Sequence, residues 1–489
     1  MLEKIDMSKK IKKGEYSDRF YELGLKLGEV QRRARDAKLP IIIVFEGWRG
    51  AKRSEIINAM MQKMDARGFD VLSTMEIVDN TTRPAFEYFW KNLPGLGEIR
   101  VYHRSWYYMG NVHLAKGDKC AGWYSYDHIN AFEKVLTDDN YIILKYFLHL
   151  DQDELKKNMD DEKSFGFAMR QKAKLVRENA HVKDYQLYYD HYDKMLTATD
   201  TNNAPWHIVP ATSTKSATIE IMESIIENVT AKLDAGKVEA PKEARTTAKY
   251  DVLSKINPAQ EMSREEYKEK FDKYQKKLGK LQVEMYKRGI SSVIGFEGWD
   301  AGGKGGSILR LTYSLDPLGY EVFPVASPTV VEKNYNYQWR FWIHLPKDGE
   351  ISIFDRTWYG RVMVERLEGF AKPHEWQRAF DEIKEMEKQW AETGMVVCKF
   401  WLQIDKDEQL RRFKERQELP EKQWKITDED WRNRDKWDAY EEAVNEMLVR
   451  TDTDYAPWVI VEGNNKYFAR LKVMKTIIDM FEKRLAKED

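Results

Sequence analysis

The chain has 489 residues, which is long for a single hydrophobic core and favours two or three domains. Its 80 Lys and Arg against 81 Asp and Glu exclude a general electrostatic attraction to nucleic acid or anionic membranes, so any anion site must be local. Two cysteines exclude a disulfide framework, and neither a signal peptide nor a membrane-length apolar run is recognisable. We therefore expect a cytoplasmic protein.

The stretch IVFEGWRGAKRSEI (43–56) comes first in the chain and predicts a strand, a loop and a helix. Short motifs from this part of the chain recur in its second half. FEGW recurs at an offset of 251 residues, from 45–48 to 296–299. VYHRSWY (101–107) matches IFDRTWY (353–359), and TDTNNAPWHIV (199–209) matches TDTDYAPWVIV (451–461), both at an offset of 252. Conserved order at a nearly constant spacing indicates a duplicated domain.

The joint between the copies is expected in the polar stretch 235–261, which is rich in Lys and Ala. This gives a first domain at 1–234, a linker at 235–261 and a second domain at 262–489.

In the second copy, SSVIGFE (291–297) predicts a strand, the following glycines predict a loop, and 307–315 predicts a helix closed by Asp316-Pro317. Four further strands are expected at 321–325, 351–355, 395–404 and 458–461, with charged helices between them. Alternating strands and helices predict an α/β fold, a mostly parallel sheet covered on both faces. Ligands of such sheets bind at the carboxyl ends of the strands.

The loop of the second copy satisfies the phosphate-binding pattern G-x-x-x-x-G-K with Gly298, Gly303 and Lys304. The hydroxyl residue that normally follows the lysine is replaced by Gly305, and Gly302 adds a further flexible position. An ordinary tight turn is the alternative. The strand before the loop and the helix after it favour phosphate binding, because backbone N–H groups and the helix dipole then converge on one place.

Without that hydroxyl, other side chains must bind the metal ion, and two carboxylates are candidates. Asp300 lies inside the loop, and Asp355 ends the apolar strand 351–355. Taken singly, they would be a turn former and a helix cap. Because both are expected at the same end of neighbouring strands, we predict that together they bind Mg²⁺.

Arginines follow that strand and recur on a later helix. Guanidinium groups fit phosphate oxygens, and phosphoryl transfer needs charge stabilisation, although exposed helices also carry arginines for solubility. Arg356, adjacent to Asp355, is the strongest candidate, and the others are Arg361, Arg366, Arg412 and Arg416.

Three blocks of the second copy, FEGWDAGGKGG, IFDRTWYGRVMVERLEGF and TDTDYAPWVIV, resemble the signatures of the polyphosphate kinase 2 family, and the resemblance covers both copies. It implies tandem P-loop kinase-like domains with helical lids and Mg²⁺-dependent phosphoryl transfer between inorganic polyphosphate and a nucleotide. The tandem arrangement is similar to the class that converts AMP to ADP. Gly360 departs from the Asn that is frequent in the family and puts fine substrate contacts in doubt.

When the functional residues of the family are assigned to the matching positions of this chain, the resemblance implies that Asp300 and Asp355 hold Mg²⁺. It also implies that Lys304 and Arg356 contact the transferred phosphate. Arg412 and Arg416 would come from the lid.

The first copy lacks these chemical groups. At the positions of Asp300 and Asp355 it has Arg49 and His103, and Lys304 is replaced by Arg53. Two loop glycines become Ala51 and Lys52. A metal between two such side chains is electrostatically implausible, so we expect a folded but non-catalytic domain that serves as interface, support or a basic surface for the polyphosphate chain.

Three other functions remain open from the sequence. Polyphosphate-dependent phosphorylation of nucleoside diphosphates and ATP-dependent phosphorylation of a nucleotide would use the same loop and metal pair. A non-catalytic polyanion-binding scaffold would suit the first copy alone. No nucleic-acid or membrane partner is expected, and the sequence leaves a homo-oligomer open.

Overall fold

A computed structural model describes the chain except for residues 9, 75–81, 117–118, 165–182, 237–248 and 488–489. The described residues form two compact units. The first comprises Met1–Thr81, Ala85–Glu239 and Val330–Asn336, and the second comprises Thr82–Pro84, Ala240–Thr329 and Tyr337–Asp489. Part of the expected linker, 237–248, lies outside the described residues, and the proposed domain boundaries stay a prediction.

The first unit is built on a five-stranded parallel sheet in the order β2-β3-β1-β4-β5. Strand β1 is almost completely buried and occupies the centre of the sheet, as expected for a continuous apolar run. The strands are β1 (Ile41–Gly47), β2 (Phe69–Leu72), β3 (Ile99–His103), β4 (Ile142–His149) and β5 (Trp206–Pro210). The helices are α1 (Lys13–Asp36), α2 (Arg53–Met61), α3 (Glu87–Lys91), α4 (Trp106–Lys116), α5 (Tyr126–Asp138), α6 (Gln152–Ser164), α8 (Tyr185–Thr199) and α9 (Thr214–Ala235).

The second unit repeats this topology in the order β7-β8-β6-β9-β10, again parallel throughout. Its strands are β6 (Ser292–Gly298), β7 (Tyr320–Pro324), β8 (Ile351–Asp355), β9 (Val396–Gln403) and β10 (Trp458–Glu462). Its helices are α10 (Arg264–Lys287), α11 (Lys304–Thr312), α12 (Trp339–Trp342), α13 (Val364–Leu367), α14 (Pro373–Glu392), α15 (Lys406–Glu418), α16 (Asp428–Asp435), α17 (Trp437–Thr451) and α18 (Lys466–Leu485). The predicted α/β class and parallel sheets are confirmed.

The predicted strands of the second unit agree with the structure within one residue, whereas the predicted helix is displaced by three residues at each end. The helix expected at 307–315 is α11, which begins at Lys304 and ends at Thr312. Glycines are poor helix formers, so Gly305 and Gly306 favoured a later start in the sequence. In the structure Gly303 has a φ of 111° and turns the chain directly into the helix. Lys304 therefore occupies the first helical position.

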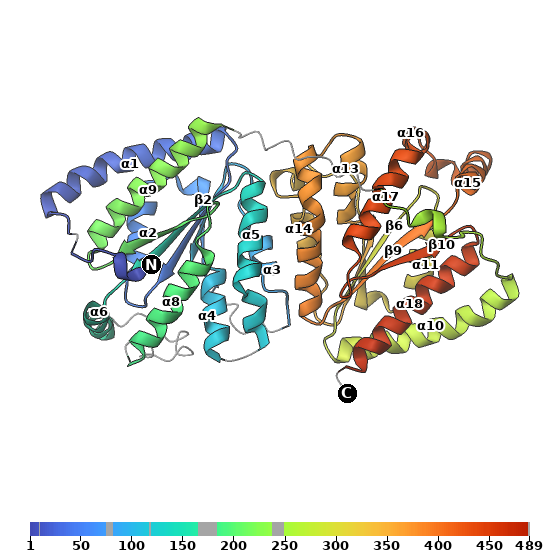
Figure 1. Cartoon of the computed structure of the whole chain (residues 1–489), viewed down its shortest axis with the longest axis horizontal. Coiled ribbons are helices and arrows are strands. Elements are labelled where there is room, and N and C mark those ends of the chain that lie inside the picture. The colour runs from blue at the N-terminus through green and yellow to red at the C-terminus, as the bar shows by residue number, and fades with distance from the viewer. Residues whose placement is uncertain (9, 75–81, 117–118, 165–182, 237–248, 488–489) are drawn as a thin grey trace. The chain divides into compact units, whose positions relative to one another are not determined.

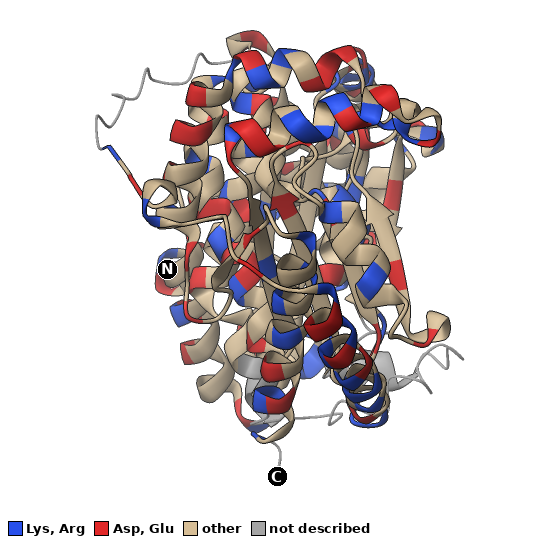
Figure 2. Ribbon diagram, turned by 90° about the vertical axis from the view of Figure 1, so that its right-hand side faces the viewer, with Lys and Arg blue, Asp and Glu red and all other residues tan. Residues whose placement is uncertain are grey.

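Helices cover both faces of each sheet (Figure 1). In the second unit, α10, α11 and α18 pack on one face, and α14 and α17 lie on the other. Apolar residues of β6, β8 and β9 form the core with α18, including Ile294, Ile353 and Met474. Figure 2 shows acidic and basic residues interspersed along the helices, as the balanced net charge suggests. Within the described residues, no helix combines the length and apolar character that a transmembrane span requires.

Each unit contains a buried ion pair at equivalent positions. In the second unit, Lys399 Nζ lies 2.8 Å from Glu387 Oε2 and also donates to Tyr359 Oη and to the carbonyl oxygen of Thr451. Trp358 Nε1 donates to the other Glu387 oxygen. The first unit repeats the arrangement with Lys145, Glu133, Tyr107, Thr199 and Trp106. The pair joins β9 to α14 at a point where both charges are removed from water.

Replacing Lys399 with Met is expected to lower the free energy of unfolding of the second unit by about 3–5 kcal/mol, because Glu387 would remain buried and unpaired. Lys277→Met is the matched control, since the Lys277–Glu482 pair is about half exposed and worth at most about 1 kcal/mol. Denaturant unfolding of both variants measures the difference. Equal losses in the two variants would contradict a special role for the buried pair.

Candidate active site

The loop between β6 and α11 has the backbone shape of a phosphate-binding turn. Gly298 has a φ of 147°, Ala301 of 59° and Gly303 of 111°, so three of its residues have a positive φ, which side-chain-bearing residues rarely adopt. At Gly302, an added Cβ would lie only 2.7 Å from the carbonyl oxygen of Trp299, so a side chain there would force the loop backbone to shift. The loop ends at the N-terminus of α11, which has no side-chain cap. Its first N–H groups are thus available to an anion.

Lys304 starts α11 and folds back over the loop. Its Nζ donates to the carbonyl oxygens of Gly298, at 2.6 Å, and of Trp299, at 3.3 Å. The ammonium group is thereby held at the mouth of the loop by uncharged acceptors. Phosphate oxygens at the helix N-terminus would offer this lysine stronger, charge-assisted partners.

Asp300 and Arg356 approach each other from the loop and from the end of β8. Arg356 Nη2 lies 3.5 Å from Asp300 Oδ1, and Asn433 of α16 donates to Asp300 Oδ2 at 3.0 Å. Burial lowers the pKa of Arg356, but the charges of Asp300, Glu297, Asp355 and Glu429 outweigh it and raise that pKa. Arg356 is therefore a fully charged cation surrounded by carboxylates.

Arg356 adopts a left-handed backbone conformation with a φ of 67°. For a residue with a side chain this conformation costs roughly 1–2 kcal/mol. It is stabilised because Arg356 N donates to the carbonyl oxygen of Phe296 in the neighbouring strand at 3.0 Å. Arg104 of the first unit has the same conformation, with a φ of 79°. The strained turn after the strand is thus common to both units, and in the second unit it directs the side chain of Arg356 towards the loop.

Asp355 is the last residue of β8 and pairs with Phe296 of β6 in the parallel register. Asp300 follows four residues after Phe296, so both carboxylates belong to the same end of adjacent strands, and both act on the charge of Arg356. Among the described residues, no group of three or more His, Cys, Asp and Glu side chains is arranged to hold a metal. The donor set fits Mg²⁺, which takes one or two carboxylates and completes its shell with water and substrate phosphates.

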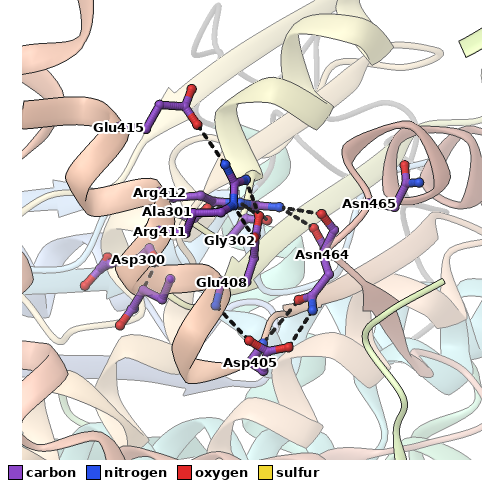
Figure 3. Close-up of polar contacts among 12 residues, drawn as sticks. Asp300, Ala301, Gly302, Asp405, Glu408, Arg411, Arg412, Glu415, Asn464 and Asn465 are labelled. Carbon is purple, nitrogen blue, oxygen red and sulfur yellow. Dashed lines mark hydrogen bonds and ion pairs between the residues drawn. The ribbon is translucent and has the colours of Figure 1, made fainter. Parts of the chain in front are cut away.

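Arg412 of α15 contacts the backbone of the loop (Figure 3). Its Nη1 donates to the carbonyl oxygens of Ala301 and Gly302, at 2.8 and 3.1 Å. Its Nη2 donates to those of Gly463 and Asn464, at 2.6 and 3.1 Å, and its Nε donates to Glu408. The side chain is 3% exposed. The described contacts thus assign Arg412 to positioning the loop, whereas its expected phosphate contact stays a prediction.

Arg412→Lys is expected to lower kcat about 10-fold, because an ammonium group cannot make the fork of hydrogen bonds that fixes the loop. Hydrogen exchange of residues 299–304 should become faster, which a purely electrostatic role would not produce. Arg411→Lys is the control, since that neighbour is exposed and binds Glu408 and Glu415. Slow exchange retained in Arg412→Lys would contradict the positioning role.

A basic pocket of about 280 Å³ opens beside the loop and the first turns of α11. Backbone of Gly302 and Gly303 forms part of its wall, and Glu415 is its one acidic lining residue among those described. Six basic side chains line it, namely Arg412, Arg416, Lys422, Lys425, Lys466 and Arg470. Burial and the charge of Arg412 lower the pKa of Lys466, as expected where cations crowd together. The pocket therefore favours an extended, highly charged anion.

The remaining predicted arginines divide between this pocket and internal ion pairs. Arg416 lines the pocket and donates to the carbonyl oxygen of Lys425 at 2.9 Å. Arg361 instead bonds to Glu365, at 2.9 Å, and Arg366 bonds to Glu446, at 2.7 Å. The structure therefore brings Asp300, Lys304, Arg356 and Arg412 to the loop and Arg416 to the pocket beside it. The described polar contacts of Arg361 and Arg366 are with carboxylates on helices. Their phosphate contacts stay a prediction.

Sequence reasoning did not identify two residues that support the site. Glu297, buried directly before Gly298, accepts hydrogen bonds from Thr357 N and Thr357 Oγ1, at 2.6 and 2.8 Å. These bonds join the end of β6 to the turn that carries Arg356. The signal was present, because FEG recurs in the first unit and Glu46 binds Ser105 in the same way. Asn433 had no comparable signal.

Comparisons with known proteins agree with this geometry. The polyphosphate kinase 2 family model matches residues 10–237 and 261–489. A polyphosphate:AMP phosphotransferase of Pseudomonas aeruginosa is 36% identical over 100% of both chains. A GDP-polyphosphate phosphotransferase of Mycolicibacterium smegmatis is 38% identical, covering 45% of this chain and 78% of its own. A crystal structure assigned to polyphosphate kinase 2 of Pseudomonas aeruginosa PA01 superposes with a TM-score of 0.86 at 35% identity, over 100% of both chains. With two matched domains and a relative of full length, this chain belongs to the polyphosphate kinase 2 family.

Proposed function

We propose that the second unit transfers the terminal phosphoryl group of inorganic polyphosphate to AMP and releases ADP. The observation that carries this proposal is the combination of a phosphate-binding loop, bearing Lys304, with a pocket lined by six basic side chains at its edge. A nucleotide donor would bring only a few phosphates, whereas a polyphosphate chain would occupy both the loop and the pocket. The relative matched over its full length is named for AMP, and the one named for GDP covers less than half of the chain.

In the proposed reaction, a phosphate oxygen of AMP attacks the terminal phosphorus of the chain. The bond from that phosphorus to its bridging oxygen breaks, and the shortened chain leaves with the electron pair and the negative charge. Lys304, Arg356 and the N–H groups at the start of α11 would stabilise the charge on the transferred group, which is the main task of a protein in phosphoryl transfer. Arg412 would keep those N–H groups in place.

Asp300 and Asp355 would hold the Mg²⁺ ion, which supplies neutralisation of charge between the phosphates. Asn433 and Arg356 would orient Asp300 for that task. The first unit, with Arg49 and His103 at these positions, would contribute no turnover of its own.

Incubating the protein with AMP, polyphosphate and Mg²⁺, without ATP, is expected to produce ADP. Parallel reactions with ADP, GMP and GDP as acceptors separate this reaction from the phosphorylation of nucleoside diphosphates. Replacing polyphosphate with ATP tests the ATP-dependent kinase. ADP formed from AMP only when ATP is supplied would reject polyphosphate as the donor, and binding of polyphosphate without any transfer would indicate a scaffold.

A further inference from the structure

The loop of the first unit retains the shape of a phosphate-binding turn although its sequence has changed. Gly47 has a φ of 124°, Gly50 of 82° and Lys52 of 51°, close to the pattern of the intact loop. Lys52 thus keeps a left-handed conformation that ordinarily favours glycine. The loop leads into α2, whose nine-residue helix lacks a side-chain cap, so its first N–H groups face the loop.

Arg53 is buried in this turn with part of its hydrogen-bonding capacity unused. Its Nη2 donates to the carbonyl oxygen of Gly47 at 3.0 Å, just as Lys304 Nζ donates to that of Gly298. Arg53 is 8% exposed. Among the described residues, none accepts a hydrogen bond from Arg53 Nε, which is itself buried. A buried guanidinium N–H without an acceptor is costly, so this group can accept a further partner such as a phosphate oxygen.

The surroundings of Arg53 keep the arginine of the other loop but lack its two carboxylates. Arg104, equivalent to Arg356, stands at the end of β3 with its guanidinium 4.4 Å from the ring centre of Tyr108. His103 occupies the position of Asp355, and its Nε2 lies 3.0 Å from Ser54 Oγ. Burial and the charges of Arg53 and Arg104 lower the pKa of His103 to about 3, so the ring is neutral. Burial and the charge of Arg104 likewise lower the pKa of Arg53 to about 10.

Glu46 is the acidic residue that acts on both Arg53 and Arg104. It is already bonded to Ser105 N and Ser105 Oγ, at 2.7 and 2.8 Å, in the way that Glu297 is bonded to Thr357. One carboxylate therefore faces two buried or half-buried guanidinium groups. In the second unit, Asp300 and Asp355 also act on Arg356, the equivalent of Arg104.

We propose that the loop of the first unit, formed by Gly47, Lys52, Arg53 and Arg104, is a binding site for the phosphate groups of an oligophosphate or nucleotide, and that it binds them without a divalent cation. The two loops would then differ in whether phosphate binding requires a divalent cation. Asp300 and Asp355 repel phosphate unless Mg²⁺ neutralises them, whereas the first loop has no carboxylate at those two positions. The site holds phosphate but performs no transfer.

Hydrogen exchange measured by mass spectrometry on the full chain tests this site directly. With EDTA and tripolyphosphate at about ten times its dissociation constant, exchange of the peptide 47–56 is expected to slow about 10-fold. The peptide 298–307, which borders the basic pocket, should gain further protection when Mg²⁺ replaces EDTA, whereas the peptide 47–56 should not. Because the readout is binding in the absence of metal, it is independent of whether polyphosphate phosphorylates AMP. Absence of protection at 47–56 in EDTA would overturn the proposal.

Two variants identify the groups responsible, and an exposed arginine provides the control. Arg104→Gln and Arg53→Gln are each expected to weaken metal-free binding of tripolyphosphate at least about 10-fold by calorimetry, whereas Arg67→Gln should not. Arg104 is only half-buried, so its variant tests the site even where the Arg53 variant loses stability. A second titration with AMP distinguishes an inorganic chain from a nucleotide phosphate. Unchanged affinity in Arg104→Gln would overturn the proposal for both ligands.

Discussion

Asp300→Asn is expected to reduce kcat for ADP formation by at least about 100-fold while leaving thermal unfolding unchanged, and Asp355→Asn should behave in the same way. Asn keeps the shape of the side chain but removes the negative charge that Mg²⁺ requires. Asp300 also binds Asn433, at 3.0 Å, and an amide oxygen can still accept that hydrogen bond. The loss should therefore come from the metal and not from the fold.

The measurement is steady-state turnover of AMP with polyphosphate over a range of Mg²⁺ concentrations. Asp381→Asn, at an exposed position on α14, is the matched control and should retain normal turnover. Near-normal turnover of Asp300→Asn at ordinary Mg²⁺ would show that the metal is held elsewhere. In the full chain, the double variant Asp300→Asn with Asp355→Asn tests the first unit, because substantial remaining activity would make that unit catalytic.

Lys304→Ala and Arg356→Ala are each expected to lower kcat by about 100-fold or more, since each removes a preorganised donor from the position where charge develops. The affinity for AMP should change less, because these groups act on the transferred phosphate. Single-turnover kinetics separate the chemical step from product release. Lys277→Ala, an exposed lysine of α10, is the control.

Lys304→Arg is the more discriminating variant, because it recreates the residue of the first unit at this position. An arginine here is expected to restore less than about a tenth of the activity, since a planar fork cannot replace the compact ammonium at the mouth of the loop. Wild-type rates in Lys304→Ala would refute the assignment of a phosphate-binding loop.

The sequence by itself determined the features that depend on neighbouring residues. The repeat, the parallel strands and the glycine loop all leave local signals, because a buried strand needs a continuous apolar run and a left-handed turn favours glycine. Asp355 could be placed at a strand end, and Arg356 next to it, for the same reason. The family resemblance rested on these same contiguous blocks.

Only the tertiary structure decided which distant side chains complete the site. Arg412 and Ala301 are 111 residues apart, and Asn433 and Asp300 are 133 apart, so no local periodicity connects them. Their pairing depends on how α15 and α16 follow the sheet and on which carbonyl groups the strained loop turns towards them. The same holds for Lys399 and Glu387, which are buried together where β9 packs on α14. A charged residue reveals its partner only when the fold removes both from water.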